Sequence, residues 1–351
     1  MNILVIRVSA IGDVIHTIPA IFLFKRHFPH AYIHWVVQQK AAHLLVDQPF
    51  LEHTWVLPDK YLQPAQWQQT ARTIKELRQH RWDAVIDFQG LLKTAAFTLP
   101  LLGKKYGFSS VHARERASAW FTHHHDAPDY VNIVQKNLSL ASTVAYHLGA
   151  TVCSPCIDDL RTTFHLAVPP KKQEQVITWF TDNQIANYLL LCPNTTWPSK
   201  HWPEDHWTSF IDLVVKAQLP ITPILVGTTF GVAAQAVAAQ CQQRNLPVVI
   251  CPAWDLLTMC HLIKHARLLI APDTGLLHIA DFLGTPAIGI FGPTNKEKHG
   301  PFWTKINKAL CIQIPCPHVY QKTHGHDGNS TCMAALTPTQ LLSQVLRSLE
   351  K

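Results

Sequence analysis

The stretch His265–Pro301, HARLLIAPDTGLLHIADFLGTPAIGIFGPTNKEKHGP, decides the fold of this chain. Its apolar runs predict two buried strands, Leu268–Ala271 and Ala287–Phe291, with a helix at Leu276–Leu283 between them. The turn Pro272–Gly275 precedes this helix and leaves backbone N–H groups unpaired at its start. Such groups, together with the positive end of the helix dipole, favour a phosphate or pyrophosphate. An ordinary βαβ crossover with a capped helix gives the same pattern, so other parts of the chain must decide between the two.

The composition predicts two well-packed domains. The chain has 351 residues, of which 47% are hydrophobic and 15% are charged, so we expect large cores and little disorder. The net charge of +7 is spread over both halves and forms no block of one sign. That pattern disfavours a nucleic acid as partner and suits an anionic substrate or an anionic membrane surface.

We expect neither a signal peptide nor a membrane-spanning segment in this sequence. Residues Met1–Arg7 predict a strand and not a signal peptide. The longest uncharged run, Ala217–Gln243, contains prolines and glutamines, which is typical of a strand, a loop and an amphipathic helix. Nine cysteines without a secretory signal indicate reduced thiols, so we expect a cytoplasmic protein.

Strands and helices alternate through the first part of the chain. The predicted strands are Ile3–Val8, Tyr32–Val37, His53–Leu57, Ala84–Asp87 and Tyr106–Phe108. The predicted helices are Val14–Phe28, which Pro19 bends or restarts, Pro64–His80, one that begins at Leu91, and Val131–Leu148. This alternation favours a parallel sheet with helices on both faces.

Residues 151–172 lose this periodicity, and we place the domain boundary there. A second alternating series follows, with strands at Tyr188–Cys192, Ile221–Val226 and Val248–Ile250 and helices at Gln173–Asn183, Glu204–Ala217, Gly231–Arg244, Leu256–His265 and Thr337–Leu349. We therefore expect an α/β protein with two Rossmann-like domains, residues 1–165 and 166–336, whose parallel sheets face a central cleft. Residues 337–351 are expected to form a C-terminal helix that packs back on the N-terminal domain.

Two loops at predicted strand ends carry polar side chains. The loop Ser9–Val14 has a single glycine, so it matches neither the dinucleotide-binding nor the P-loop pattern. Its Asp13 is either a helix N-cap or a general base. The loop Asn194–Pro203 offers Thr195, Thr196 and Lys200, which suit phosphate oxygens but would equally form a polar helix cap.

Seven segments taken together resemble the motifs of the ADP-heptose:lipopolysaccharide heptosyltransferases, glycosyltransferase family 9. They are RVSAIGDVIHT at Arg7–Thr17, DAVIDFQGLLK at Asp83–Lys93, ARE at Ala113–Glu115, Thr195-Thr196, KHWP at Lys200–Pro203, DTGLLH at Asp273–His278 and FGPT at Phe291–Thr294. They occur in the family's order over most of the chain. The Thr-Thr, KHWP and QGLLK forms most resemble heptosyltransferase I, which adds the first heptose to Kdo.

The resemblance implies a fold, a reaction and a set of partners. The fold is GT-B, with an N-terminal domain for the acceptor, Kdo–lipid A, and a C-terminal domain for the donor, ADP-heptose. The reaction is an inverting transfer of L-glycero-D-manno-heptose in lipopolysaccharide core synthesis of Gram-negative bacteria, with neither metal nor cofactor. The protein is expected to be a monomer, peripheral on the cytoplasmic face of the inner membrane.

The resemblance also assigns roles to residues. Asp13 matches the catalytic base. Basic residues near the acceptor are Lys93, Arg114 and Arg116. Donor-binding residues are Thr195, Thr196 and Lys200 for the phosphates, Asp273 for the sugar, the backbone of Thr274, Gly275 and Leu276 for the pyrophosphate, and His278 in the same motif. Because base and donor residues belong to different domains, chemistry should require the two domains to close.

The chain departs from the family pattern at two places. After Val226-Gly227 the family carries an acidic residue for the ribose hydroxyls, whereas this chain has Thr228-Thr229. We expect Thr229 to bind the ribose through its hydroxyl, which leaves the nucleotide preference open. The second departure is a thiol-rich tail whose spacing misses the usual paired arrangement of zinc sites. It comprises Cys311, Cys316, His318 and Cys332.

Three other functions are compatible with parts of the sequence. The first is a relative that uses a later inner-core acceptor or a different nucleotide sugar. The second is a nicotinamide-dependent oxidoreductase, which the missing glycine pattern disfavours. The third is a module that binds a nucleotide sugar without catalysis.

Overall fold

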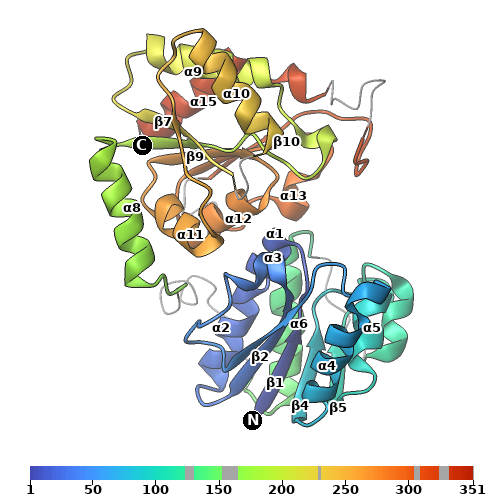
Figure 1. Cartoon of the computed structure of the whole chain (residues 1–351). Coiled ribbons are helices and arrows are strands. Elements are labelled where there is room, and N and C mark those ends of the chain that lie inside the picture. The colour runs from blue at the N-terminus through green and yellow to red at the C-terminus, as the bar shows by residue number, and fades with distance from the viewer. Residues whose placement is uncertain (123–129, 152–164, 228–230, 304–308, 324–331, 351) are drawn as a thin grey trace. The chain divides into compact units, whose positions relative to one another are not determined.

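The computed structural model describes residues 1–122, 130–151, 165–227, 231–303, 309–323 and 332–350 (Figure 1). The chain forms two compact units, Met1–Ala167 and Val168–Lys351. The division falls two residues beyond the predicted boundary at 165. It lies in the region where the alternating pattern of the sequence is lost.

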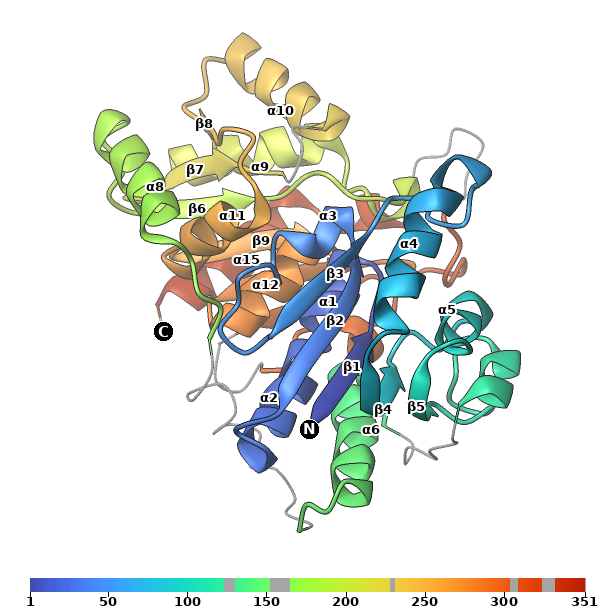
Figure 2. The same ribbon diagram turned by 60° about the horizontal axis from the view of Figure 1, so that its bottom comes forward.

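The first unit contains a five-stranded parallel sheet with the order β3-β2-β1-β4-β5. Its strands are β1 (Asn2–Ile6), β2 (Tyr32–Gln38), β3 (His53–Leu57), β4 (Arg81–Asp87) and β5 (Leu102–Gly107). Its helices are α1 (Ile11–Ile15), α2 (Ile18–His27), α3 (Gln39–Ala42), α4 (Trp67–Leu77), α5 (Leu92–Thr98) and α6 (Ile133–His147), with 3-10 helices η1 (Pro64–Gln66) and η2 (Arg116–Phe121). Helices α2 and α6 pack together on one face, and α4 and α5 lie on the other, as right-handed crossovers require (Figure 2).

The second unit contains a six-stranded parallel sheet with the order β11-β10-β9-β6-β7-β8. Its strands are β6 (Tyr188–Leu191), β7 (Thr222–Leu225), β8 (Val249–Ile250), β9 (Leu268–Pro272), β10 (Ala287–Phe291) and β11 (Leu310–Gln313). Its helices are α8 (Pro170–Asp182), α9 (Glu204–Lys216), α10 (Val232–Gln243), α11 (Leu256–Lys264), α12 (Gly275–Leu283), α13 (Lys296–His299) and α15 (Pro338–Leu349), with η3 (Pro198–Lys200) and η4 (Met333–Ala335). Figure 1 shows α9, α10 and α15 on one face of this sheet and α8, α11 and α12 on the other.

The order of the strands fixes where each unit can bind a ligand. In the first sheet the chain leaves β1 toward β2 but leaves β4 toward β5, so its direction changes between β1 and β4. In the second sheet the corresponding change lies between β6 and β9. Ligands of open parallel sheets bind at the carboxyl ends of the strands at such switch points. We therefore expect a ligand to bind at the loops that follow these four strands.

The stretch that decides the fold has the predicted structure. Strand β9, the turn, helix α12 and strand β10 follow one another with nearly the expected bounds. Both strands are buried throughout, which explains their continuous apolar runs. Helix α12 ends at Gly284, whose φ of 84° is the left-handed conformation that glycine adopts without strain.

The predicted C-terminal helix forms, but it belongs to the second unit. Helix α15 begins with a capping box in which Thr337 and Gln340 exchange hydrogen bonds. It packs on α9, and its Leu341 and Val345 are buried in the core that contains Trp207. The apolar face of α15 is thus used within the second unit.

Several short elements differ from the predicted ones. The predicted helix Val14–Phe28 is two helices, α1 and α2, and Pro19 stands in the first turn of α2, where its missing N–H costs nothing. Helix α3 and strand β11 have no predicted counterpart. Strand β5 begins four residues earlier than expected, at Leu102, because a polar Lys104-Lys105 pair masks the pattern of an edge strand.

A cluster of histidines and tryptophans lies across β2 and β3. His34 is 7% exposed, and its ring lies 4.9 Å from Trp82 and 6.0 Å from His80 between ring centroids. Burial, with the positive charges that His80 and His53 can carry, lowers the pKa of His34 to about 4. Since His34 titrates near its ordinary pKa of 6.5 in the unfolded chain, the unfolded state binds the proton first as the pH falls.

The protein is therefore expected to lose stability between pH 6.5 and 4. His34 contributes up to about 3 kcal/mol of this loss, and His34→Phe should flatten the pH dependence by that amount. Urea unfolding at about pH 7 and about pH 4.5 measures the difference. The matched control is His43→Phe at an exposed site, which should leave the pH dependence unchanged. Equal pH dependence in wild type and His34→Phe would contradict the prediction.

Candidate active site

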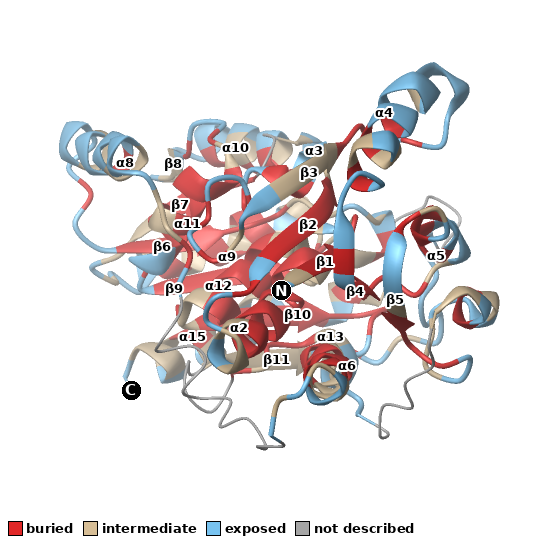
Figure 3. Ribbon diagram, turned by 90° about the horizontal axis from the view of Figure 1, so that it is seen from below, coloured by how far each residue is buried: buried red, intermediate tan, exposed pale blue. Residues whose placement is uncertain are grey.

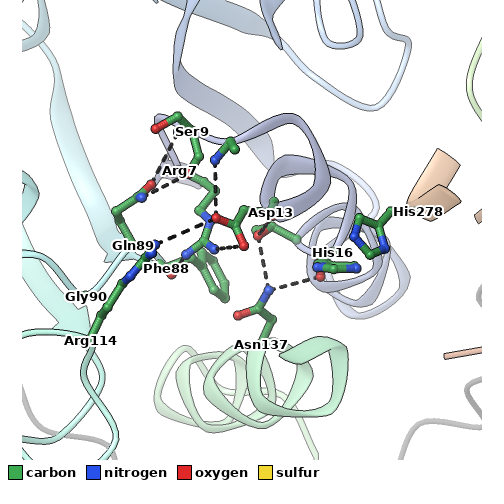
Figure 4. Close-up of polar contacts among 12 residues, drawn as sticks. Arg7, Ser9, Asp13, His16, Phe88, Gln89, Gly90, Arg114, Asn137 and His278 are labelled. Carbon is green, nitrogen blue, oxygen red and sulfur yellow. Dashed lines mark hydrogen bonds and ion pairs between the residues drawn. The ribbon is translucent and has the colours of Figure 1, made fainter. Parts of the chain in front are cut away.

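Asp13 in the first unit lies at the switch point between β1 and β4 (Figure 4). It stands in the first turn of α1, where its Oδ2 accepts the Ala10 N–H at 3.2 Å. Its Oδ1 lies 2.8 Å from the Nη2 of Arg7, a side chain that is only 4% exposed. The Nη1 of Arg114 lies 4.0 Å from Oδ2. The N-cap of α1 is Ala10 and Asp13 is the third residue of the helix, so the N-cap alternative for Asp13 is wrong and the general base stays a prediction.

The surroundings of Asp13 keep its carboxylate ionised. Burial raises the pKa of Asp13, but the Arg7 guanidinium and, to a lesser degree, His16 outweigh that effect. The pKa therefore lies below its ordinary value. Because the side chain retains 22% exposure, the carboxylate is ready to accept a proton and still accessible to a ligand.

Gln89, in the loop after β4, holds the backbone that leads into Asp13. Its Oε1 accepts N–H groups of Val8 at 3.1 Å and Ser9 at 3.3 Å, and its Nε2 donates to the Ser9 carbonyl at 2.9 Å (Figure 4). Arg7 also donates to the Phe88 carbonyl. The carboxylate, its guanidinium partner and the backbone between them are therefore fixed by one neighbouring loop.

Asp87 at the end of β4 shapes that loop. Its Oδ1 accepts the Gln89 N–H at 2.8 Å and the Gly90 N–H at 3.3 Å, and its Oδ2 accepts the Thr94 hydroxyl at 3.0 Å. Burial raises the pKa of Asp87 to about 6, although these donors oppose the rise. Gly90 has φ 63°, and a Cβ there would lie 3.2 Å from the Arg114 nitrogen. Glycine therefore lets the segment that carries Arg114 approach.

The three predicted acceptor-binding residues do not lie together at Asp13. Arg114 is the one that reaches Asp13, as a partly exposed guanidinium. Arg116 begins η2 and is exposed. The Nζ of Lys93 lies 5.8 Å from the centroid of the Tyr61 ring, which is a cation–π contact. The structure thus brings Arg114 to the candidate base and leaves Lys93 and Arg116 on the surrounding surface.

Lys200 and Asp273 in the second unit meet at the switch point between β6 and β9. The Lys200 Nζ lies 2.7 Å from the Asp273 Oδ2 and 3.3 Å from the Asp273 carbonyl oxygen. The His278 Nε2 lies 3.1 Å from Oδ1 and donates to it, because an ionised carboxylate only accepts. The three side chains are between 6% and 12% exposed.

The carboxylate of this buried triad is held ionised. Burial raises the pKa of Asp273, but the hydrogen bond from His278 and the charge of Lys200 outweigh burial and hold that pKa far below its ordinary value. The Lys200 ammonium also lies 4.5 Å from the centroid of the Trp197 ring. A cation is therefore held in place beside the start of α12, where helix amides already favour an anion.

The other predicted donor-binding residues are neighbours of these three residues in the sequence, apart from Thr229. The Thr195 hydroxyl donates to the Trp197 carbonyl at 2.7 Å, whereas Thr196 is exposed. Thr274 is the N-cap of α12 but its side chain makes no capping hydrogen bond, and its buried hydroxyl has no partner among the described residues. Gly275 and Leu276 form the first turn of α12. Thr229 lies outside the described residues.

Sequence patterns missed two side chains that hold loops of the second unit in place. The Asn194 Oδ1 accepts the Ala234 N–H at 3.1 Å and thereby caps α10, and a Cβ on Gly231 would lie 2.8 Å from that oxygen. The Gln313 Nε2 on β11 lies 3.1 Å from the Gly292 carbonyl and 3.2 Å from the Thr294 carbonyl. Asn194 lies shortly after β6 and Gln313 ends β11, and these positions are the signal in the sequence that could have indicated their roles.

The described ranges of the chain contain no cluster of three or more His, Cys, Asp or Glu side chains with the geometry of a metal site. In those same ranges, no helix has the length and apolar character needed to cross a membrane. Cys311 on β11 is half-buried, and burial raises the pKa of its thiol to about 11.

Solved heptosyltransferases share this architecture. The structure of the E. coli heptosyltransferase WaaC with ADP matches with a TM-score of 0.76 and 22% identity, over 99% of this chain and 100% of that chain. The E. coli ADP-heptose LPS heptosyltransferase II matches with a TM-score of 0.75 and 18% identity, over 100% and 99%. The chain therefore has the GT-B fold of these proteins, with two parallel α/β units, and the predicted fold class is confirmed.

The family follows from the sequence comparison. The model of glycosyltransferase family 9 (heptosyltransferase) matches residues 70–327, and this chain belongs to that family. The lipopolysaccharide heptosyltransferase 1 of Pseudomonas aeruginosa is 28% identical over 336 residues, which cover 92% of this chain and 87% of that protein. Its counterpart in E. coli K12 is 27% identical over 323 residues, 89% and 93% of the two chains. The chain is therefore a glycosyltransferase most like the heptosyltransferases 1, and the oxidoreductase alternative is set aside.

Proposed function

We propose that this enzyme transfers L-glycero-D-manno-heptose from ADP-heptose to Kdo in the inner core of lipopolysaccharide, with inversion and with Asp13 as general base. The observation that carries the proposal is the ionised, partly exposed Asp13 beside Arg7 and Arg114, in a family-9 chain similar to heptosyltransferases 1. Structures of WaaC with ADP and with an ADP-2-deoxy-2-fluoro heptose support the nucleotide sugar as donor class.

The acceptor half of the proposal follows from the charges around Asp13. A Kdo hydroxyl that attacks the anomeric carbon must lose its proton, and Asp13 is a carboxylate that is ready to take it. The Arg114 guanidinium is 64% exposed and can meet the carboxylate of an acidic sugar. Lys93 and Arg116 extend this positive surface toward the rest of an anionic acceptor. Transfer then requires the acceptor bound at this site to react with the nucleotide sugar bound at the donor site.

The donor half follows from the Lys200 triad. The leaving group is a nucleotide diphosphate, so its departure needs positive potential. We assign that role to Lys200 and the first amides of α12, with Thr195, Thr196, Thr274, Gly275, Leu276 and His278 around them, and to Thr229 the ribose contact. Asp273 holds the sugar hydroxyls beside an oxocarbenium-like transition state. The proposal includes no metal or cofactor, a monomeric enzyme, and a peripheral position on the cytoplasmic face of the inner membrane.

Replacing Arg7 is expected to shift the acidic limb of the pH–rate profile. The Arg7 charge lowers the pKa of Asp13, and the base works only when unprotonated. Arg7→Gln should therefore raise the pH at which kcat/KM falls by about one unit or more, and Arg7→Lys should restore most of the wild-type profile. The measurement is kcat/KM from about pH 3 to about pH 8. A lower rate with an unmoved limb would show that Arg7 has only a structural role.

A donor screen tests the substrate assignment. The purified enzyme is given a Kdo-bearing acceptor and, separately, ADP-heptose, ADP-glucose, UDP-glucose and GDP-mannose. We expect turnover with ADP-heptose and at least about a hundredfold lower kcat/KM with the others, because a site that pairs the donor's polar groups rejects analogues that leave them unpaired. Turnover with another nucleotide sugar and none with ADP-heptose would overturn the substrate assignment while leaving the enzyme class intact.

A further inference from the structure

Large apolar side chains stand in solvent along the β5 edge of the first unit. Trp120 on η2 is 80% exposed and Val111 in the preceding loop is 79% exposed. Leu92 on α5, Leu99 directly after α5 and Leu102 at the start of β5 are exposed as well. Figure 3 shows the exposed residues of α5 at this side of the unit. These five residues, together with the basic residues Lys93, Lys104, Lys105, Arg114 and Arg116, are called the α5–η2 face below.

The elements that carry these side chains form one surface. Helix α5 and η2 pack against each other. The Leu92 N–H donates to the Glu115 Oε2 at 2.6 Å, which ties the start of α5 to the residue before η2. Leu92 at the start of α5 and Leu99, the residue after its end, are both exposed, while Ala95 and Phe97 of α5 are buried. The exposed side chains of α5 and η2 are therefore carried by elements that are fixed to each other.

The same stretch is strongly basic. Residues 88–122 contain five Lys or Arg residues and one acidic residue, Glu115. Their net charge of +4 (five minus one) is more than half of the +7 of the whole chain. The basic residues are Lys93, Lys104, Lys105, Arg114 and Arg116. The net charge is similar in the two halves of the chain, so counting charges by halves did not reveal this basic stretch. The prediction that the charge forms no block of one sign is corrected here.

This combination fits a lipid surface better than a protein partner. Protein interfaces have an apolar core that is depleted of charged residues, whereas in residues 88–122 the exposed apolar side chains are interspersed along the chain with Lys and Arg. An indole ring has its preferred place at the boundary of headgroups and acyl chains, and each nearby Lys or Arg adds attraction to anionic headgroups. The segment that carries Val111 and Trp120 also carries Arg114 beside Asp13. A bilayer contacted by these side chains would thus lie next to the proposed acceptor site.

We propose that the α5–η2 face docks on the surface of an anionic phospholipid bilayer, with Trp120 and Val111 inserted at the headgroup boundary and Lys93, Lys104 and Arg116 against the headgroups. This docking rests on the function proposed above, because the acceptor of that function contains lipid A, which is anchored in a membrane. The binding surface is nevertheless defined by this chain's own exposed residues.

Cosedimentation with vesicles that contain no acceptor tests the docking. The wild-type protein should bind phosphatidylethanolamine vesicles that contain roughly 30% phosphatidylglycerol, and should bind pure phosphatidylcholine vesicles much more weakly. Trp120→Ser should weaken binding to the anionic vesicles about fivefold to tenfold. The control is Trp67→Ser, a 60% exposed tryptophan on α4, which should bind like wild type. No binding by the wild type, or equal losses in both variants, would overturn the proposal.

Two acceptors separate this proposal from the proposed function. With a soluble, deacylated Kdo acceptor, Trp120→Ser should keep its kcat/KM within about twofold of wild type, because Trp120 has no role in the proposed chemistry. With Kdo–lipid A in anionic vesicles its kcat/KM should fall about fivefold to tenfold. Equal loss on both acceptors would overturn docking. If the wild type transfers heptose to neither acceptor but still binds vesicles, the proposed function fails and the docking surface stands.

Discussion

Asp13→Asn is expected to lower kcat by about 10²- to 10⁴-fold, the range that a positioned general base contributes. Asparagine keeps the size of the side chain and its hydrogen-bonding reach, but it cannot take the proton of the attacking hydroxyl. ADP affinity should stay within about twofold, because the Lys200 triad belongs to the other unit. Steady-state kinetics and calorimetric titration with ADP measure the two quantities.

A matched control keeps this result interpretable. Asp47→Asn replaces an exposed aspartate of the same unit and should leave kcat unchanged; its φ of 60° is one that asparagine also adopts. In Asp13→Asn the neutral asparagine leaves the buried Arg7 charge without its partner, so thermal unfolding must show that the variant is folded at the assay temperature. A folded Asp13→Asn enzyme with nearly wild-type kcat would exclude Asp13 as the base.

Lys200→Met is expected to weaken donor binding about tenfold to a hundredfold and to destabilise the second unit by about 3 kcal/mol. Methionine fills most of the space of the lysine but removes the cation that faces the diphosphate. It also removes the ammonium that pairs with the Asp273 carboxylate, which is 8% exposed. Among the contacts described above, His278 is the side chain that still pairs with this carboxylate. Titration with ADP and urea unfolding measure the two effects.

A second variant separates binding from stability. Asp273→Asn combined with Lys200→Met removes the uncompensated buried charge, so stability should largely recover while ADP affinity should not. Lys216→Met is the control, since Lys216 pairs with Asp212 on the exposed side of α9 and such pairs contribute less than about 1 kcal/mol. Wild-type ADP affinity in folded Lys200→Met would show that Lys200 serves the fold alone.

The sequence predicted the elements whose signal is local. The run Leu268–Phe291 contains two apolar strands, a turn and a helix with a glycine stop, and each of these depends on neighbouring residues. Parallel sheets followed from the alternation of such units. The sequence did not predict α3, β11 or the early start of β5, because short edge elements bury too little surface to impose a pattern.

The candidate site was predictable residue by residue but not as a set of contacts. Lys200 and Asp273 are 73 positions apart, and only the pairing of β6 with β9 brings their loops together. Gln89 lies within a recognised motif, yet its hold on Ser9 depends on β4 lying beside β1. Long-range contacts of this kind require the strand order, which periodicity along the chain does not contain.

Mass spectrometry of Kdo–lipid A incubated with the enzyme and ADP-heptose tests the proposed function most directly. The account predicts a product heavier by one heptosyl residue, with one ADP released per transfer and no such product from Asp13→Asn. An unchanged mass of Kdo–lipid A, in a reaction where the same enzyme glycosylates another acceptor or uses another nucleotide sugar, would contradict it.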